Sequence, residues 1–574
     1  MKYIHHRCRF PTAASGILVL LLALGGNHEL ALAAPAEAEA AAAAAAGATQ
    51  GHLQPKRNLI FMISDGFGQT SEAMARGFVQ QQQQNQQNQK QDGYSQWTNA
   101  LDSLLVGSVR TRSSDTWVTD SAAGATAYSC AQKTYNGAIG VDEGGRPCGT
   151  VLEAARLRGY LTGLVTTARI THATPAAFAA HVVDRDMEDL IAQQLLQFAP
   201  SANNNNKTAA AASTVVPAVD LMLGGGLCHF VPNGSNSEKN QSCRADSLDL
   251  WQAARQSGVT TITQKQELDA LVTAASRKLP LLGLFAPGHM AYEIDRARTA
   301  QPSLLEMTTS ALQILHNATT TANNNSSSSS GFFLMIEGAR IDMAGHDNDP
   351  AAHLRDILEY WRTVDAVRSF VDDHPDTLLV STSDHETGGM ALGVDPEYLW
   401  NPQVLDPVAR SAESVCARLR AMSDDDGDQS VDDYVAETVL PKHLGIRNAT
   451  DAEVDTVVGA AGMDSKRCKR TVGGVVSKRA HIGWSTGGHT GADVGLYAYG
   501  SSNGSQLQQD ALRMFRGNMD NTQVGRALAA YLNVSLEDAT KAVVRRPSTL
   551  ALAKRRPNTT LASASANKPY ADHN

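Results

Sequence analysis

The run Asn58-Leu59-Ile60-Phe61-Met62-Ile63-Ser64 is apolar without alternation and stops at Asp65-Gly66. An unbroken apolar run of this length is typical of a strand that is buried on both faces, as in a parallel sheet. Helix-like stretches such as Thr150–Arg158 and Ala351–Asp372 separate further runs of the same kind. These runs are Tyr160–Thr167, Val219–Leu223, Leu279–Phe285, Gly331–Ile336 and Asp376–Thr382. The pattern predicts an α/β fold with a large, mostly parallel central sheet flanked by helices.

Side chains that can bind metal ions follow four of the predicted strands. Ligands of open parallel sheets bind at the carboxyl ends of the strands, so these side chains are expected at one edge of the sheet. In chain order they are Asp65, then His172 and Thr174, then Glu337, Asp342 and His346, and then Asp384 and His385. His489, between glycines, joins them as a further candidate ligand. Each motif alone has an ordinary interpretation, but together they predict a polynuclear metal site.

The stretch from Val118 to Tyr128 places the hydroxyl of Ser121 just ahead of a run of small residues. This pattern is typical of a helix N-terminus, where the free amides and the helix dipole favour an anion such as phosphate. Two interpretations of Ser121 remain open from these residues: a helix cap, or a nucleophile toward a phosphoryl group. Arg185 is equally open, since it can pair with the neighbouring Asp184 or Asp186 or bind an anion.

The N-terminal residues 1–34 have the pattern of a secretory signal. Three cations precede the apolar run Ile17–Leu24, and small residues follow at Ala31–Ala34. The run is far shorter than the roughly 20 residues of a membrane-spanning helix, so a membrane anchor is expected only if the signal is retained. We expect a secretory-pathway protein that is secreted or extracellular, with a vacuolar or cell-surface location as alternatives.

Composition limits the partners and the remaining segments. A formal net charge of −9 over 574 residues argues against a nucleic-acid-binding protein, so any bound anion must meet local cations. Residues 35–55 are predicted to be a low-complexity linker. Residues 544–574 are predicted to be a disordered polar tail. Three internal low-complexity tracts are predicted as disordered surface loops. They are Gln80–Gln91, Asn203–Ser213 and Thr319–Ser330.

Six cysteines remain after the predicted signal, an even number that suggests disulfides in an oxidising compartment. Neighbours in sequence are candidate pairs, although the sequence leaves the connectivity open. The six are Cys130, Cys148, Cys228, Cys243, Cys416 and Cys468. Sequons at Asn317, Asn448 and Asn533 can carry glycans.

The motifs between Asp65 and about Tyr499 together resemble the alkaline phosphatase family, and Lys133–Asp142 is most similar to its eukaryotic branch. The resemblance rests on Ser-Asp65-Gly, Thr-Asp120-Ser121-Ala-Ala-Gly-Ala-Thr-Ala, Thr-His172-Ala-Thr174-Pro-Ala-Ala, His-Val-Val-Asp-Arg185, Glu337-Gly-Ala-Arg-Ile-Asp342-Met-Ala-Gly-His346, Thr-Ser-Asp384-His385-Glu-Thr-Gly-Gly and Gly-Gly-His489-Thr-Gly-Ala-Asp-Val. Collectively these motifs are highly specific.

The resemblance implies an enzyme that hydrolyses small phosphate monoesters to alcohol and inorganic phosphate at alkaline pH. It implies a phosphoserine intermediate on Ser121, and an Arg185 that is oriented by Asp120 and binds two phosphoryl oxygens. It also implies two Zn²⁺ ions and one Mg²⁺ ion, which suit these ligand types. By position, the first zinc would be held by Asp342, His346 and His489, the second by Asp65, Asp384 and His385, and the magnesium by Asp65, Thr174 and Glu337.

Two positions depart from the family members used as references. His172 stands where some bacterial members carry Asp, which leaves a direct or an indirect magnesium role open. Met343 replaces the Lys, His or Trp often found there, and a methionine cannot help to hold phosphate as a cation would. We therefore predict weaker retention of product phosphate, and faster turnover at high pH, than in a lysine-bearing relative.

The resemblance also implies a division of the chain. Residues 56–394 and 481–543 would form the phosphatase core, and residues 395–480 a small crown subdomain near the interface of a homodimer. Two alternatives stay open at this stage. One is a phosphodiesterase or sulfatase on the same metal scaffold, and the other is a catalytically silent secreted binding protein.

Overall fold

The computed structural model describes residues 57–86, 97–197, 215–234, 242–275, 278–321, 331–394, 398–423 and 430–545. The described residues all belong to one compact unit. The predicted signal (1–34), the predicted linker (35–55), the tract Asn203–Ser213 and nearly all of the predicted tail lie outside them.

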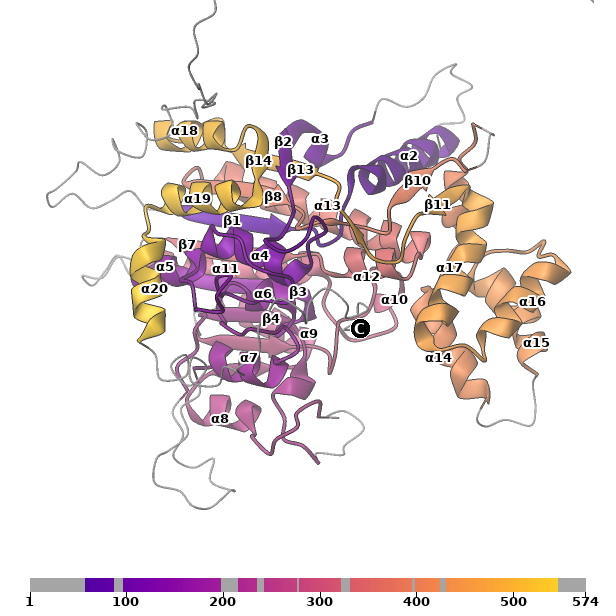
Figure 1. Cartoon of the computed structure of the whole chain (residues 1–574), viewed down its shortest axis with the longest axis horizontal. Helices are drawn as coiled ribbons and strands as arrows, with labels where there is room; N and C mark the ends of the chain where they lie inside the picture. The colour runs from indigo at the N-terminus through magenta and orange to yellow at the C-terminus, as the bar shows by residue number, and fades with distance from the viewer. Residues whose placement is uncertain are drawn as a thin grey trace, which may run out of the picture. The chain divides into compact units, whose positions relative to one another are not determined.

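Ten strands form one sheet in the order β14-β2-β13-β8-β1-β7-β3-β4-β6-β5 (Figure 1). All six strands predicted from the apolar runs are present and pair in parallel, which confirms the predicted fold class. The strands are β1 Asn58–Ile63, β2 Leu105–Arg110, β3 Leu161–Arg169, β4 Leu221–Gly225, β5 Thr260–Ile262, β6 Leu281–Leu284, β7 Phe332–Glu337, β8 Thr377–Thr382, β13 Val494–Gly500 and β14 Gly517–Asp520. The short strands β9 Glu386–Thr387, β10 Met390–Leu392, β11 Ile482–Trp484 and β12 His489–Thr490 form two small pairs, β9 with β12 and β10 with β11.

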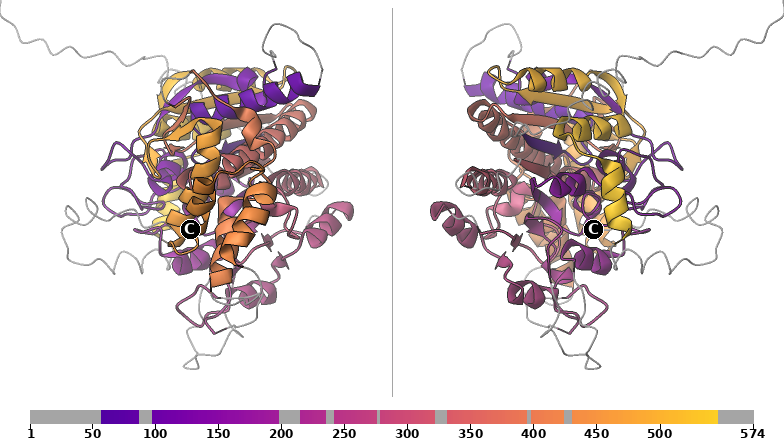
Figure 2. Two further views of the ribbon diagram at one scale, coloured as in Figure 1. Left: turned by 90° about the vertical axis from the view of Figure 1, so that its right-hand side faces the viewer. Right: turned by 90° about the vertical axis from the view of Figure 1, so that its left-hand side faces the viewer.

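Helices cover both faces of the sheet (Figures 1 and 2). The α-helices are α2 Gln69–Gln86, α3 Ala100–Leu104, α4 Ser121–Cys130, α5 Val151–Leu157, α6 Ala173–Ala176, α7 Glu188–Leu195, α8 Leu250–Gln256, α9 Lys265–Thr273, α10 Glu293–Arg296, α11 Leu304–Thr321, α12 Arg340–His346, α13 Pro350–Asp373, α14 Ala412–Ser423, α15 Val431–Tyr434, α16 Asp451–Ala460, α17 Ser465–Ala480, α18 Gln506–Met514, α19 Asn521–Leu532 and α20 Leu536–Val544. The described residues also form two 3₁₀ turns, Leu227–His229 and Pro402–Leu405, and the π-helix Val435–His443. Among the described helices, none combines the length and the apolar character needed to cross a membrane.

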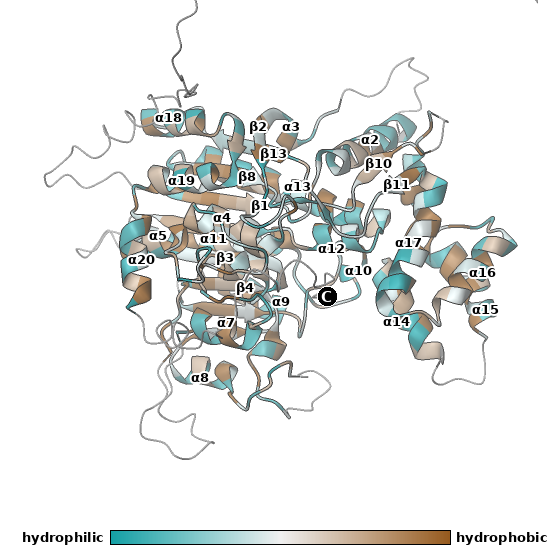
Figure 3. Ribbon diagram, viewed as in Figure 1, coloured by the Kyte–Doolittle hydropathy of each residue, from teal (hydrophilic) through white to brown (hydrophobic). Residues whose placement is uncertain are grey.

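The side chains of β1 show why its sequence is apolar without alternation. Leu59, Phe61 and Ile63 enter one apolar cluster, to which α4, α5, α7, α8 and α19 contribute. Ile60 and Met62 enter a second cluster, which is lined by α2, α11, α13, α14 and α17. Successive residues of a strand point to opposite faces, so a strand between two helical layers must be apolar at every position. Figure 3 shows the resulting pattern, with brown strands and teal residues mainly on the surrounding helices and loops.

Two of the predicted loops are partly helical. The prediction of a loop from Gln80 is wrong up to Gln86, because α2 continues through these glutamines. Glutamine is a good helix former, and the helix is anchored by buried residues such as Phe78. Similarly, α11 extends to Thr321, into the tract predicted as a loop from Thr319.

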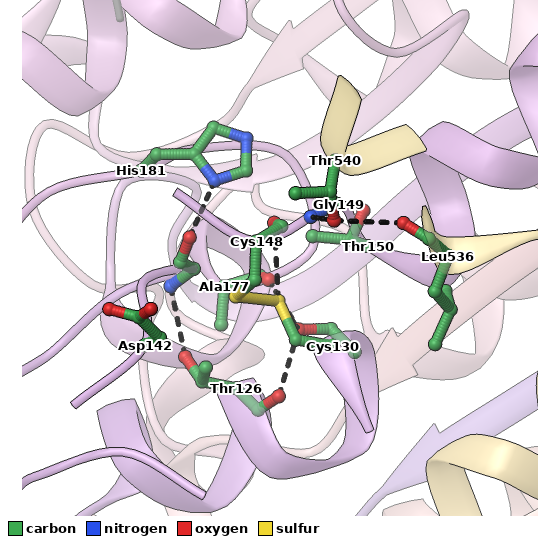
Figure 4. Close-up of a disulfide and its surroundings, with 12 residues drawn as sticks. Thr126, Cys130, Asp142, Cys148, Gly149, Thr150, Ala177, His181, Leu536 and Thr540 are labelled. Carbon is green, nitrogen blue, oxygen red and sulfur yellow. Dashed lines mark hydrogen bonds between the residues drawn. A yellow bond between two sulfur atoms is a disulfide. The ribbon is translucent and has the colours of Figure 1, made fainter. Parts of the chain in front are cut away.

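Three disulfides join neighbours in sequence: Cys130–Cys148, Cys228–Cys243 and Cys416–Cys468. The first ties the C-terminal end of α4 to the loop before α5 (Figure 4). In the same region the Thr126 hydroxyl on α4 donates to the carbonyl of Ala138 and accepts from the amide of Gly140. The helix that begins with Ser121 is therefore fixed at its far end by a covalent bond.

The segment predicted as a crown, residues 395–480, contains α14 to α17 and the disulfide Cys416–Cys468. In the left view of Figure 2 these orange helices face the viewer. Apolar side chains of α14 and α17 belong to the same cluster as those of α13, so the segment packs on the core. Its place near a dimer interface stays a prediction.

Candidate active site and metal centre

The sheet order brings the chemically active strand ends side by side. Strands β8, β1, β7 and β3 are neighbours and run parallel, so their carboxyl ends lie at one edge. This edge carries Asp384 and His385 after β8, Asp65 after β1 and Glu337 at the end of β7. His172 and Thr174 follow β3.

Ser121 is the first residue of α4, and the preceding Asp120 is the N-cap, so Ser121 is not the cap of this helix. Asp120 Oδ1 accepts the amide of Ala123 at 2.9 Å. The Ser121 hydroxyl is buried, with Oγ 3.0 Å from His385 Nε2 and 3.4 Å from both carboxylate oxygens of Asp65. A buried hydroxyl at a helix N-terminus, surrounded by metal-binding side chains, has the surroundings of a nucleophile rather than of a cap.

Arg185 forms an ion pair with Asp120, which lies far from it in sequence. Its Nη1 lies 3.1 Å from Asp120 Oδ2, which also accepts the amide of Gly137 at 2.9 Å. Arg185 Nη2 lies 3.0 Å from His172 Nε2. Since an arginine only donates, this geometry assigns the ring proton of a neutral His172 to Nδ1.

Asp342, His346 and His489 meet at the end of α12 and the start of β12. His346 Nε2 is 3.2 Å from Asp342 Oδ2, and His489 Nε2 is 3.6 Å from Asp342 Oδ1. His346 Nδ1 donates to the carbonyl of Gly487, and His489 Nδ1 donates to that of Thr119, each at 2.8 Å. Both Nε2 atoms therefore present lone pairs, and they face each other at 3.1 Å. Two such lone pairs repel unless a cation or a proton lies beside them, so this arrangement fits a metal ion.

A second group consists of Asp65, Asp384 and His385, whose side chains are fully buried. Their candidate ligand atoms lie within 4.8 Å of one another. His385 also belongs to a group with Asp342 and His489, and its ring stacks on that of His489 at 3.5 Å between centroids. Burial, followed by the neighbouring carboxylate of Asp384, raises the pKa of Asp65 well above its ordinary value. The fold thus holds carboxylates together at a cost in electrostatic free energy, and a bound cation would offset this cost.

Asp65, His172 and Glu337 form a third group, with ligand atoms also within 4.8 Å of one another. Burial raises the pKa of Glu337 to about 7. Glu337 Oε1 and the nearby candidate ligand Thr174 Oγ1 are buried and lack a hydrogen-bond partner within the described part of the chain. Oxygen atoms left in this state fit a hard cation such as magnesium.

Among the residues that the structure describes, one further cluster has metal-binding residue types: Cys228, His229 and Cys243. Its two cysteines form a disulfide, so they offer no thiolate. This cluster is therefore not a metal centre in the oxidised protein.

Several residues that support the site were not found from the sequence. The Thr166 hydroxyl donates to Glu337 Oε2 at 2.5 Å, and the Thr387 hydroxyl donates to Asp342 Oδ1. Arg470 of α17 donates to the carbonyl of His346. A threonine in or beside a strand and an arginine in a basic helix carry no signal of their own, so only their position identifies them.

Met343 is almost fully buried, in an apolar cluster with Tyr292 and several alanines. Its sulfur lies 2.8 Å from Nη1 of Arg340, whose guanidinium stacks on the Tyr292 ring at 3.6 Å and pairs with Glu413. The position after Asp342 therefore already has a cation beside it. The predicted effect of Met343 on phosphate retention stays a prediction.

Comparison with known proteins gives one consistent result. A family model described as alkaline phosphatase matches residues 56–534. The chain is 40% identical to an alkaline phosphatase of Schizosaccharomyces pombe over 505 residues, covering 87% of this chain and 85% of that one. It is also 40% identical to the repressible alkaline phosphatase of Saccharomyces cerevisiae over 497 residues, covering 84% and 83%. Among solved structures, Thermus thermophilus alkaline phosphatase matches with a TM-score of 0.65 and 29% identity, covering 89% of this chain and 99% of that one.

Proposed function

This chain belongs to the alkaline phosphatase family and hydrolyses phosphate monoesters, and we propose that it does so through a phosphoserine on Ser121. The observation that carries the proposal is the position of Ser121 Oγ, buried between His385 and Asp65 at the start of α4. The relatives at 40% identity are alkaline phosphatases. This likeness rules against a silent binding protein and against a phosphodiesterase or sulfatase.

The family is metal-dependent, and the three groups of ligand atoms offer places for the ions. We assign zinc to the two groups around His346 and His385, where imidazole nitrogens face carboxylates. We assign magnesium to the oxygen atoms of Asp65, Thr174 and Glu337, which suit a hard cation. When bound, such ions supply positive charge that lowers the pKa of the Ser121 hydroxyl and of a hydrolytic water, and that stabilises the leaving alkoxide.

The protein's own residues then account for the remaining chemistry. Ser121 Oγ forms a bond to phosphorus as the bond from phosphorus to the alcohol oxygen breaks, and water later cleaves the phosphoserine. Arg185 binds two non-bridging oxygens in a bidentate fork, and Asp120 holds the guanidinium in place. For His172 we propose an indirect role. Its Nε2 accepts a hydrogen bond from Arg185 and therefore carries no proton. A neutral imidazole that bound a metal ion through Nδ1 would carry its proton on Nε2, so it could not accept this hydrogen bond.

The test is the Ser121→Ala variant, analysed for metal content and for hydrolysis of p-nitrophenyl phosphate. We expect about two zinc ions and one magnesium ion per chain in both proteins, with turnover nearly abolished in the variant. Acid-quenched wild-type protein should carry phosphate on Ser121. A variant with near-normal turnover would remove Ser121 from the mechanism, and wild-type protein that stays active after complete metal stripping would contradict the metal assignment.

We also propose that the protein enters the secretory pathway and acts as a secreted homodimer. The signal-like pattern of residues 1–34 and three disulfides support an oxidising compartment. The sequon residues Asn448 and Asn533 are exposed and open to glycosylation. Cell fractionation, glycosidase treatment and light scattering of the purified protein test location, glycans and dimer separately.

A further inference from the structure

Two adjacent cations of α17 contact the C-terminal end of the metal-site helix α12. Lys469 Nζ lies 2.9 Å from Asp347 Oδ1, and both side chains are buried. Arg470 Nε donates to the carbonyl of His346 at 2.9 Å, and its Nη2 donates to the carbonyl of Gly487 at 2.8 Å. One guanidinium therefore joins the backbone of α12 to the loop that leads to His489.

The carbonyl of Gly487 has a second donor. His346 Nδ1 donates to the same oxygen at 2.8 Å, which leaves His346 Nε2 facing Asp342 and His489. Arg470 thus holds the carbonyl of Gly487, and this carbonyl sets the tautomer and the ring orientation of His346. Arg470 also holds the carbonyl of His346 itself. Hydrogen-bond partners of this kind orient metal ligands, and their loss typically weakens metal binding about 10- to 100-fold.

Gly487 is also packed tightly against the same guanidinium. A Cβ atom at this position would lie 1.9 Å from Arg470 Nη2. The φ of Gly487 lies outside the left-handed region, so its backbone alone does not require glycine. The absence of a side chain at Gly487 is explained by the guanidinium that occupies the space.

We propose that Arg470 is a positioning residue for the half of the metal site formed by Asp342, His346 and His489. The segment of residues 395–480 thereby contributes to that half, whereas Asp65, Asp384 and Glu337 come directly from strand ends. This inference rests on the metal assignment of the proposed function.

The experiment compares metal affinity in Arg470→Ala, Arg470→Lys and Arg467→Ala. Arg467 is exposed on the same helix and serves as the matched control. Zinc retained per chain is measured at fixed free Zn²⁺ set by a competing chelator. We expect Arg470→Ala to bind one ion about 10- to 100-fold more weakly and the others as wild type does. Arg470→Lys should be intermediate because it can reach one carbonyl, and Arg467→Ala should be unchanged.

Gly487→Ala adds a test that does not remove the arginine. Its methyl group should displace the guanidinium and reproduce the loss of affinity seen in Arg470→Ala. In the Arg470→Ala background the space is open, so Gly487→Ala should add little. Wild-type zinc affinity in Arg470→Ala, or fully additive losses in the double variant, would overturn the proposal.

Two controls separate this outcome from others. The first is the free energy of unfolding of the metal-free proteins. If Arg470 acts only on the docking of α17, Arg470→Ala lowers this free energy but leaves the zinc affinity unchanged. If Arg470→Ala fails to fold, Arg470→Lys and Gly487→Ala still decide the question. His489→Ala tests the underlying assignment: if it loses no ion, the proposed function is wrong, and if it loses an ion while Arg470→Ala does not, only this inference is wrong.

Discussion

Replacing Asp120 with asparagine should weaken phosphate binding while leaving α4 capped. Asp120 Oδ1 caps the helix at the amide of Ala123, and Oδ2 accepts from Gly137 and from Arg185 Nη1. The oxygen of an asparagine can keep the cap, but its amide group then faces two donors. The charge-assisted bond to Arg185, worth about 1.5–3 kcal/mol, is lost. Since 1.4 kcal/mol corresponds to a factor of ten, the inhibition constant of inorganic phosphate should rise about 10- to 100-fold.

Asp120→Ala is the matched variant that removes the cap as well. Loss of an N-cap costs about 1 kcal/mol, whereas the amide of Gly137 loses its acceptor in both variants. We therefore expect Asp120→Ala to lower the free energy of unfolding by about 1 kcal/mol more than Asp120→Asn does. Chemical denaturation of the two variants measures the difference.

The assay for Arg185 is initial-rate inhibition by phosphate in a double-mutant cycle. If Asp120 acts through Arg185, then Asp120→Asn should change the inhibition constant less than about threefold when Arg185 is already alanine. A wild-type inhibition constant in Asp120→Asn would refute the reasoning. Independent, additive effects of the two substitutions would do the same.

Three further outcomes are expected. Met343→Lys should have a free energy of unfolding up to about 4 kcal/mol lower than that of Met343→Leu in denaturation, because it adds a charge next to the buried Arg340. The hypothesis drawn from the sequence predicts stronger phosphate inhibition in Met343→Lys than in the wild type. Burial lowers the pKa of His353 from 6.5 to about 4, so the unfolded chain takes up a proton that the folded protein excludes. Stability should therefore fall as the pH drops below about 6.5, by about 1.4 kcal/mol at pH 5.5, and the fall should be smaller in His353→Gln. Replacing both Cys130 and Cys148 with serine removes a disulfide that closes a loop with a sequence separation of 18. The free energy of unfolding, measured without reducing agent, should fall by about 3 kcal/mol.

The central strands were predictable because their burial on both faces leaves a simple signal. Strand β13 was missed, although it inserts between β2 and β8 and pairs antiparallel with both. Its sequence is apolar, but it lies far from its partners in the chain, and nothing local indicates that it enters the sheet. Strand β2 has mixed burial and so lacks the unbroken apolar pattern. The edges of the sheet are set by tertiary pairing, which local sequence does not encode.

The site divides in a similar way. Asp65, Asp384 and Glu337 could be placed together from sequence because they end adjacent parallel strands. The hydrogen bond from Thr166 to Glu337 and the contact of Arg470 with α12 could not be predicted, because ordinary residues gain these roles only through packing. The disulfides are an intermediate case, since pairing of sequence neighbours was a natural candidate that the sequence alone left open.

The charges around Ser121 explain why phosphate binding in this protein must depend on metal ions. Four buried carboxylates belong to the three metal groups, and Arg185 is already paired with Asp120. Two like unit charges 4 Å apart at an effective dielectric constant of 20 repel by about 4 kcal/mol, so a phosphate dianion would be rejected by this site as it stands. Cations bound by these carboxylates would reverse the sign of the local field. An acidic protein can thus bind an anionic substrate without a basic surface, because the same carboxylates that repel the phosphate recruit the ions that attract it.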